Sequence, residues 1–341
     1  MKCKLWISLL CIVLSTGIAS GKHRVYIVNS YNPDTFSWTR EINDGIVKGF
    51  TQYGLTQGAD YEIVTDHMDA LVKSSEEQMK AEGERITADI KAKKPDIIIT
   101  TDDDALAFVG LNFTDIPVVF SGVNGDPAKY LHAEQLDSIE KPGHNITGVY
   151  QMTYFKQSLN LVKMINSNAT GFAVVTDEST TSHAILQGLE TVKSELPLEL
   201  KDVFRSRDFS AWKTKVAELQ NKVDAIFFIS FNSVQENGKM VSIADAGEWI
   251  QNNNQIPVFS CWGYQVQSGV LLSAADDGGQ QGLYAAKHVV GILEGTDPGS
   301  LAIVCPPNGV PVLNAKTAQA MGLSLPEDVL SLFIENGVIY K

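Results

Sequence analysis

The chain is poor in basic residues for its size. Its 341 residues include 27 Lys and Arg against 40 Asp and Glu, which gives a formal net charge of −13. Because nucleic acids and anionic membrane surfaces bind basic faces, this balance argues against both as partners. Apolar residues make up 44% and charged residues 20% of the chain. These proportions are typical of a globular protein and exclude a disordered or collagen-like chain.

The sequence also lacks the short motifs of common enzyme classes. It contains no G-x-x-x-x-G-K-[ST] loop, no G-x-G-x-x-G after the first expected strand, no G-x-S-x-G elbow, no H-E-x-x-H and no C-x-x-C. Asp102, Asp103 and Asp104 are consecutive, but no further cluster of His or acidic residues accompanies them in the sequence. We therefore predict no metal site, no cofactor and no catalytic residue, and an α/β enzyme is the least favoured hypothesis.

Long apolar runs are absent except near the start of the chain. An apolar run over residues 5–14 follows Lys2 and Lys4 and precedes a series of small residues. This layout predicts a secretory signal peptide over residues 1–21, because a membrane-spanning helix needs about 20 apolar residues. We therefore expect a periplasmic or extracellular protein.

Cysteine is rare as well. Cys3 and Cys11 would leave with the signal peptide, so only Cys261 and Cys305 would remain. An oxidising compartment permits one disulfide between them, and two buried free thiols are the alternative. The sequence leaves both open, because it does not give the separation of the two residues in space.

Strand-like and helix-like segments alternate along the remaining chain. Short apolar runs predict strands at 25–28, 61–64, 97–99, 117–120, 146–150, 172–175, 203–204, 225–229, 257–259 and 270–272. Apolar residues at helical spacing predict helices between them, the clearest at 38–50, 79–90, 155–162 and 283–293. This alternation is typical of parallel sheets covered on both faces. The predicted fold is α/β, with two doubly wound parallel-sheet lobes of four or five strands each.

The two lobes are expected to be joined by strand crossovers. No Pro-, Gly- or Ser-rich linker separates the halves of the sequence, which disfavours a flexible tether. We expect residues 22–148 plus 274–305 to form the N-terminal lobe. Residues 149–273 plus 306–341 would form the C-terminal lobe.

The carboxyl ends of the expected strands, where open α/β sheets bind ligands, carry hydroxyls, amides, carboxylates and aromatic rings. Six of these ends contain neither Lys nor Arg. We therefore expect a small polar ligand with an apolar or aromatic part and at least one positive group. The candidate ligand-binding residues are Ser30, Tyr31, Trp38, Asp103, Ser121, Asn124, Asp177, Asn232, Trp262 and Tyr264.

Several candidates have an expected role and a plainer alternative. Asp103 would counter an amino group of the ligand, and Asn124 would give hydrogen bonds. The second lobe would clamp the ligand through Asp177, Asn232 and Trp262. Polar residues that precede helices are also ordinary N-caps, and Trp38 is as readily explained as the first core residue of its helix.

Six segments of the sequence carry a family resemblance. Residues 28–33, Val-Asn-Ser-Tyr-Asn-Pro, are followed by Trp38 and Gly45-Ile46. The other segments, in chain order, are 94–99 with Asp103, then 117–124, 145–149, 291–295 and 314–323. Together they resemble the ABC-transporter substrate-binding proteins of the tryptophan/tyrosine-binding type. The resemblance spans essentially the whole mature chain.

This resemblance implies a type I periplasmic binding fold. Two lobes would close on a small ligand by hinge bending, and the closed form would be presented to an ABC permease in the membrane. The implied ligands are aromatic amino acids or other small organic molecules, bound by a protein that we expect to be monomeric. Similar openings occur in sensory domains, so the alternative is a ligand-sensing receptor that acts through a sensor kinase.

Overall fold

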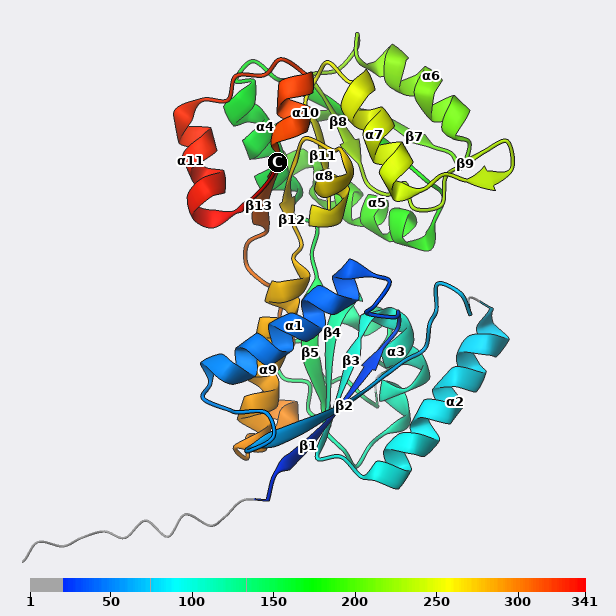
Figure 1. Cartoon of the computed structure of the whole chain (residues 1–341), viewed down its shortest axis with the longest axis vertical. Coiled ribbons are helices and arrows are strands. Elements are labelled where there is room, and N and C mark those ends of the chain that lie inside the picture. The colour runs from blue at the N-terminus through cyan, green and yellow to red at the C-terminus, as the bar shows by residue number, and fades with distance from the viewer. Residues whose placement is uncertain (1–20, 74, 133) are drawn as a thin grey trace, which may run out of the picture.

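Two sheets, each flanked by helices, form two lobes in the computed structural model, which describes residues 21–73, 75–132 and 134–341 (Figure 1). The α/β class and the two-lobe architecture predicted from the sequence are confirmed. The predicted signal peptide, residues 1–21, lies outside the described residues except for Gly21. Within the described ranges, no helix combines the length and the apolar character that crossing a membrane requires.

The first lobe has an all-parallel sheet in the order β2-β1-β3-β4-β5. Its strands are β1 (His23–Asn29), β2 (Tyr61–His67), β3 (Ile97–Thr101), β4 (Val118–Asn124) and β5 (Ile146–Gln151). Helices α1 (Ser37–Gln52) and α9 (Gly278–Leu293) cover one face, and α2 (Glu76–Lys93) and α3 (Asp102–Phe108) cover the other. Alternate residues of β1 therefore enter different cores, Val25 and Ile27 on the α1 side and Tyr26 and Val28 on the α2 side.

Three short 3₁₀ helices complete the first lobe. They are η1 (Gly110–Asn112), η2 (Pro127–Lys129) and η4 (Pro298–Ser300).

The sequence predicted a strand buried on both faces from the β-branched run Ile97 to Ile99. This run lies in β3 at the centre of the sheet, and all three side chains are fully buried.

The second lobe has a seven-stranded sheet in the order β14-β13-β12-β11-β8-β6-β7. Its strands are β6 (Gly171–Thr176), β7 (Glu199–Arg205), β8 (Ala225–Phe228), β11 (Val258–Ser260), β12 (Leu272–Ala275), β13 (Val310–Asn314) and β14 (Val338–Tyr340). Its helices are α4 (Phe155–Ile165), α5 (Thr180–Val192), η3 (Lys193–Glu195), α6 (Phe209–Leu219), α7 (Ile243–Asn253), α8 (Gly263–Ser268), α10 (Ala315–Ala320) and α11 (Glu327–Asn336). A small hairpin joins β9 (Gln235–Glu236) to β10 (Lys239–Met240).

The second sheet differs from the predicted one in two ways. It has seven strands instead of four or five, because β13 and β14 near the carboxyl terminus were not expected. It is also mixed, since β13 pairs antiparallel with β12 while the other pairs are parallel. The pair is antiparallel because β12 runs toward the crossovers between the lobes, whereas β13 starts at the crossovers and runs away from them.

Three crossovers connect the lobes (Figure 1). They follow β5, β12 and the segment near Val304, and they run through residues 152–154, 276–277 and 305–309. The predicted boundaries at 148/149 and 273/274 fall inside β5 and β12, whose strands continue to Gln151 and Ala275. Cys305 lies at the third crossover, and both it and the buried Cys261 are free thiols.

Helix α9 returns from the second lobe and packs on α1 at unusually close range (Figure 1). The two backbones approach so closely because glycines face one another. A Cβ atom added at Gly45 would lie 2.3 Å from the carbonyl oxygen of Gly279, and one added at Gly282 would lie 2.1 Å from that of Ile42. This contact anchors the segment after the second crossover on the first sheet.

We predict opposite effects for the same substitution at two glycines of α9. Gly282→Ala should lower the free energy of unfolding by about 1–3 kcal/mol, because the methyl group forces α1 away. Gly291→Ala should raise it by up to about 1 kcal/mol, because its Cβ would meet nothing closer than 3.7 Å and alanine favours a helix. Urea unfolding of both variants measures the difference. Equal free energies of unfolding for the two variants would show that the contact between α1 and α9 has space for an added methyl group.

Candidate functional site

The carboxyl ends of strands from both sheets face each other across the gap between the lobes. A cavity of about 80 Å³ lies there, lined by residues from both lobes. We call it the aromatic chamber. Its lining residues are Tyr31, Phe36, Trp38, Asp102, Asn124 and Gln151 from the first lobe, and Thr181, Asn232, Trp262 and Tyr264 from the second.

Aromatic rings from the two lobes meet in this chamber. Tyr31 and Phe36 pack edge to face with centroids 5.1 Å apart. Phe36 reaches across to Tyr264 at 6.3 Å, and Tyr264 stacks on Trp262 at 5.9 Å with an interplanar angle of 15°. The amide Nδ2 of Asn232 donates to the Tyr264 hydroxyl at 3.0 Å. Five aromatic rings thus line the chamber, a setting that suits an apolar or cationic group.

Asp102 is the acidic group of the aromatic chamber. It begins α3 with a φ of 65°, a left-handed conformation that is uncommon outside glycine. Its Oδ1 accepts a hydrogen bond from Trp38 Nε1 at 2.9 Å, and its Oδ2 has no partner although the residue is only 3% exposed. Burial raises the pKa of Asp102 well above its ordinary value, the hydrogen bond from Trp38 opposes this, and the charge of Asp103 raises it further.

Ser30 holds the turn that places Asp102. Its hydroxyl donates to the carbonyl oxygen of Thr101 at 2.8 Å and accepts from the backbone N–H of Ala105, also at 2.8 Å. Ser30 is fully buried and does not line the chamber. The hydroxyl of Ser30 therefore binds the backbone on either side of Asp102, and its contact with a ligand stays a prediction.

Asp103, predicted as the counter-ion, occupies a different position. Its Oδ1 accepts from the backbone N–H of Asn124 at 2.9 Å, and its Oδ2 accepts from Asn124 Nδ2 at 2.8 Å. Both oxygens are engaged, so Asp103 orients Asn124 while its neighbour Asp102 lines the chamber. The sequence alone does not indicate which of the three consecutive aspartates lines the chamber, because that depends on the left-handed backbone turn at Asp102.

Asp177, predicted to clamp the ligand, is hydrogen-bonded within the second lobe and lines neither cavity of the cleft. It is 0% exposed, and its Oδ1 accepts hydrogen bonds from the hydroxyls of Ser179 and Ser182, both at 2.6 Å. Its Oδ2 accepts from the Ser230 hydroxyl and the Ser233 backbone N–H, each at 3.0 Å. Burial alone would raise the pKa of Asp177, but these donors lower it below the ordinary value. Both oxygens of the Asp177 carboxylate thus accept hydrogen bonds, and the carboxylate connects the loops that follow β6 and β8.

The remaining predicted residues divide in the same way. Tyr31, Trp38, Asn124, Asn232, Trp262 and Tyr264 line the aromatic chamber. Ser121 is fully buried in β4, and its hydroxyl has no hydrogen-bond partner among the described residues. Sequence reasoning missed Phe36, Asp102, Gln151 and Thr181. Gln151 ends β5 and Thr181 follows the hydroxyl-rich end of β6, so a wider window after each strand would have included both.

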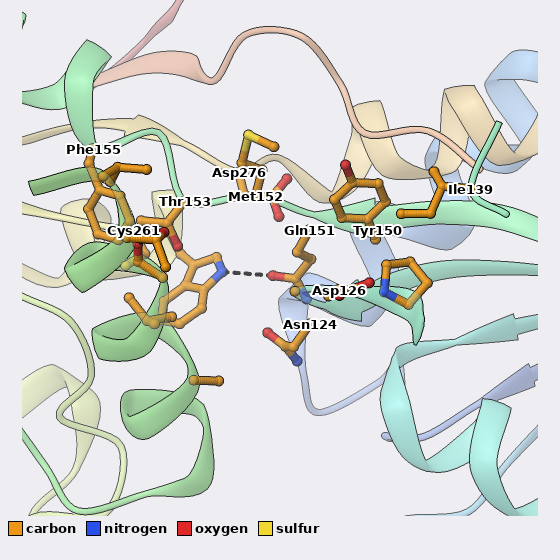
Figure 2. A pocket seen from close by; sticks show the side chains of 18 residues that line it. Asn124, Asp126, Ile139, Tyr150, Gln151, Met152, Thr153, Phe155, Cys261 and Asp276 are labelled. Atoms are coloured by element: carbon orange, nitrogen blue, oxygen red, sulfur yellow. Dashed lines mark hydrogen bonds between the residues drawn. The ribbon is translucent and has the colours of Figure 1, made fainter. Parts of the chain in front are cut away.

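Gln151 links the two lobes. Its Oε1 accepts from Trp262 Nε1 at 3.2 Å, and its Nε2 donates to the carbonyl oxygen of Gly122 at 2.5 Å. Figure 2 shows the first of these bonds crossing the space between the lobes. This pair and the contact between Phe36 and Tyr264 hold the lobes together across the cleft.

A larger cavity adjoins the aromatic chamber and shares Asn124, Gln151 and Trp262 with it. It has a volume of about 340 Å³, and we call it the apolar chamber. Figure 2 shows its lining from both lobes, with Tyr150 and Ile139 facing Phe155 and Cys261. Among the described residues, neither chamber is lined by a lysine or an arginine.

The acidic groups of the cleft are not arranged as a metal site. Over residues 21–73, 75–132 and 134–341, no group of three or more His, Cys, Asp or Glu side chains could hold a metal ion. The cleft combines isolated carboxyl groups, amides and aromatic rings, a set suited to binding a small organic molecule with a positive group.

Comparisons with known proteins bear on this cleft. A tyrosine-binding protein of Clostridioides difficile (strain R20291) is 24% identical over 210 residues, and the chain spans only 58% of the length of that relative. A solved ABC domain from Streptococcus pneumonia in complex with L-Trp matches with a TM-score of 0.67 at 20% identity, over 93% of this chain and 99% of the other. A ligand-free, open substrate-binding protein from Clostridium difficile matches with a TM-score of 0.72 at 18% identity, over 94% and 99%.

The two solved structures share the fold of this chain, which is that of type I periplasmic binding proteins. A sequence model of one family, described as ABC transporter substrate binding protein, matches residues 39–335. That match includes strands and helices of both lobes and most of the residues of both chambers. The chain therefore belongs to the ABC transporter substrate-binding protein family.

Proposed function

We propose that the protein captures a small organic molecule with a positively charged amino group between its lobes and delivers it to an ABC permease. One observation carries the proposal: Asp102, whose Oδ2 has no hydrogen-bond partner, lines a chamber of aromatic rings in which no described lining residue is basic. An unpaired buried carboxyl oxygen costs free energy, and an ammonium donor relieves that cost. The same group repels a purely anionic ligand.

An amino acid with an aromatic side chain is the ligand that we favour. The tyrosine-binding relative and the L-Trp complex of the solved neighbour support this choice. The ring of Trp262, which lines both chambers, offers a stacking surface for such a side chain. The carboxylate of the amino acid would accept hydrogen bonds from amides such as Asn124 and Asn232, which line the same chamber.

Closure of the lobes would strengthen this binding. The bond between Gln151 and Trp262 and the contact between Phe36 and Tyr264 form only when the lobes are together. Closing removes water from the cleft, and a charge-assisted hydrogen bond to Asp102 becomes stronger in the drier surroundings. The ligand would thus stabilise the closed form, which is the one that a permease would receive.

The proposal includes a place and a partner in the cell. We propose that residues 1–21 direct export and that the mature protein acts in the periplasm or outside the cell as a monomer beside its permease. The family supports transport over the alternative of a receptor that signals through a sensor kinase. The ligand would be released unchanged, since the protein would bind it without catalysis.

We predict that Asp102→Asn weakens binding of amine ligands about 10- to 100-fold, the effect of losing one charge-assisted hydrogen bond. The measurement is titration calorimetry with an amino acid selected from a thermal-shift screen. Asp104→Asn is the matched control, because it removes the same charge two residues away at a side chain that lines neither chamber. Wild-type affinity in Asp102→Asn would overturn the proposal.

We also predict that affinity for such a ligand falls as the pH falls. The ionised form of Asp102 binds the ammonium, and burial raises the pKa of Asp102 well above its ordinary value, so acidification protonates it at a higher pH than an exposed aspartate. Binding should weaken as the pH is lowered, while the ligand amino group stays charged. The weakening should be smaller in Asp102→Asn. Affinity that increases on acidification would contradict this role of Asp102.

A further inference from the structure

The aromatic chamber is too small to hold an aromatic amino acid by itself. Its volume of about 80 Å³ lies well below the roughly 300–1,000 Å³ of typical small-molecule sites. The apolar chamber, at about 340 Å³, falls within that range. Because Asn124, Gln151 and Trp262 line both, the two chambers are neighbouring parts of one cleft.

The apolar chamber suits a flat hydrophobic group. Most of its wall surface is apolar, and the side chains that line it include those of Ile139, Met152, Phe155, Ile185 and Val192. Gly188 of α5 also lines it, and a Cβ added there would meet no atom within 4 Å. The chamber therefore has open space beside α5, and burying a ring there would remove both ring and wall from water.

Asp276 is the buried carboxyl group of the apolar chamber. Its Oδ1 accepts from Gln281 Nε2 at 3.1 Å, while its Oδ2 has no hydrogen-bond partner although the residue is only 5% exposed. Burial raises the pKa of Asp276 to about 7, so at neutral pH it is not a strong counter-ion. A neutral donor such as a hydroxyl group fits it better than a second cation.

Asp276 and Asp102 lie within reach of one small ligand. The backbone N–H of Gly122 donates to Gln281 Oε1 at 3.2 Å, and the other amide atom of Gln281 donates to Asp276. A Cβ added at Gly122 would lie 3.3 Å from Asp102 Oδ1. The two carboxyl groups are thus separated by one glycine and one glutamine side chain.

We propose that the apolar chamber holds an aromatic ring that carries a hydroxyl group, with Asp276 as the hydrogen-bond partner of that hydroxyl and Asp102 as the partner of the amino group. The proposal rests on the proposed function and adds the part of the cleft that determines specificity. A site built to pair with a hydroxyl group discriminates strongly against the analogue that lacks it, because its own polar group is then left unpaired.

The test compares L-tyrosine with L-phenylalanine and O-methyl-L-tyrosine, which lack the hydroxyl proton, by titration calorimetry on the mature protein. The wild type should bind L-tyrosine at least about tenfold more tightly than either analogue. In Asp276→Ala the preference should shrink to within about threefold through weaker binding of L-tyrosine. Gln281 keeps a partner in this variant, the carbonyl oxygen of Tyr150 at 3.2 Å. If the variant does not fold, the comparison of the three ligands in the wild type still decides.

A second pair of variants tests the chamber itself. Gly188→Leu should weaken L-tyrosine binding at least about tenfold, because the new side chain fills the space for the ring. Gln187→Leu adds the same side chain to an exposed position of α5 and should bind within about twofold of the wild type.

Unchanged binding in Gly188→Leu, or a wild type that does not favour L-tyrosine over its analogues, would overturn this inference. Neither result would touch the proposed function, which depends on the effect of Asp102→Asn. If Gly188→Leu loses binding while Asp102→Asn keeps wild-type affinity, the apolar chamber still holds the ring. The proposed bond between Asp102 and the ligand's amino group is then wrong.

Discussion

The hydrogen bond between Trp38 and Asp102 is the interaction on which the site depends. It fixes one oxygen of a buried carboxyl group and leaves the other without a partner. Burial of a carboxyl group in this way is unfavourable, and the protein sustains it by a left-handed turn that Ser30 holds from both sides. A ligand that donates a hydrogen bond to the free oxygen of Asp102 removes this free-energy cost. The unfavourable burial in the unbound protein therefore favours binding.

The fold supplies the frame for this carboxyl group. Three crossovers place the strand ends of two sheets opposite each other, and the close packing of α9 on α1 fixes the second crossover against the first lobe. Gln281 on α9 then reaches both Gly122, at the end of β4, and Asp276, on the crossover. The same helix contact that stabilises the first lobe therefore positions polar groups at the floor of the cleft.

The sequence predicted the parts of this arrangement that depend on local pattern. The β-branched run at Ile97 to Ile99 and the helical spacing from Trp38 to Phe50 predicted β3 and α1, and the polar strand ends located the cleft. What it did not predict depends on contacts between distant segments. Asp103 and Asp177 were chosen for their charge, but amide and hydroxyl groups from other loops engage both carboxylates. The C-terminal strands β13 and β14 were missed, because β13 pairs with β12 only after the chain has passed through the first lobe and returned.

The most direct measurement uses the indole N–H signals of the tryptophans in ¹⁵N-labelled protein. Trp38 donates to Asp102 in the first lobe and Trp262 donates to Gln151 across the cleft, whereas Trp212 donates to Ser206 away from both chambers. Titration with L-tyrosine or L-tryptophan should shift the signals of Trp38 and Trp262 together and leave that of Trp212 in place. Saturable binding with both cleft signals unmoved would show that the ligand binds elsewhere and would contradict the account.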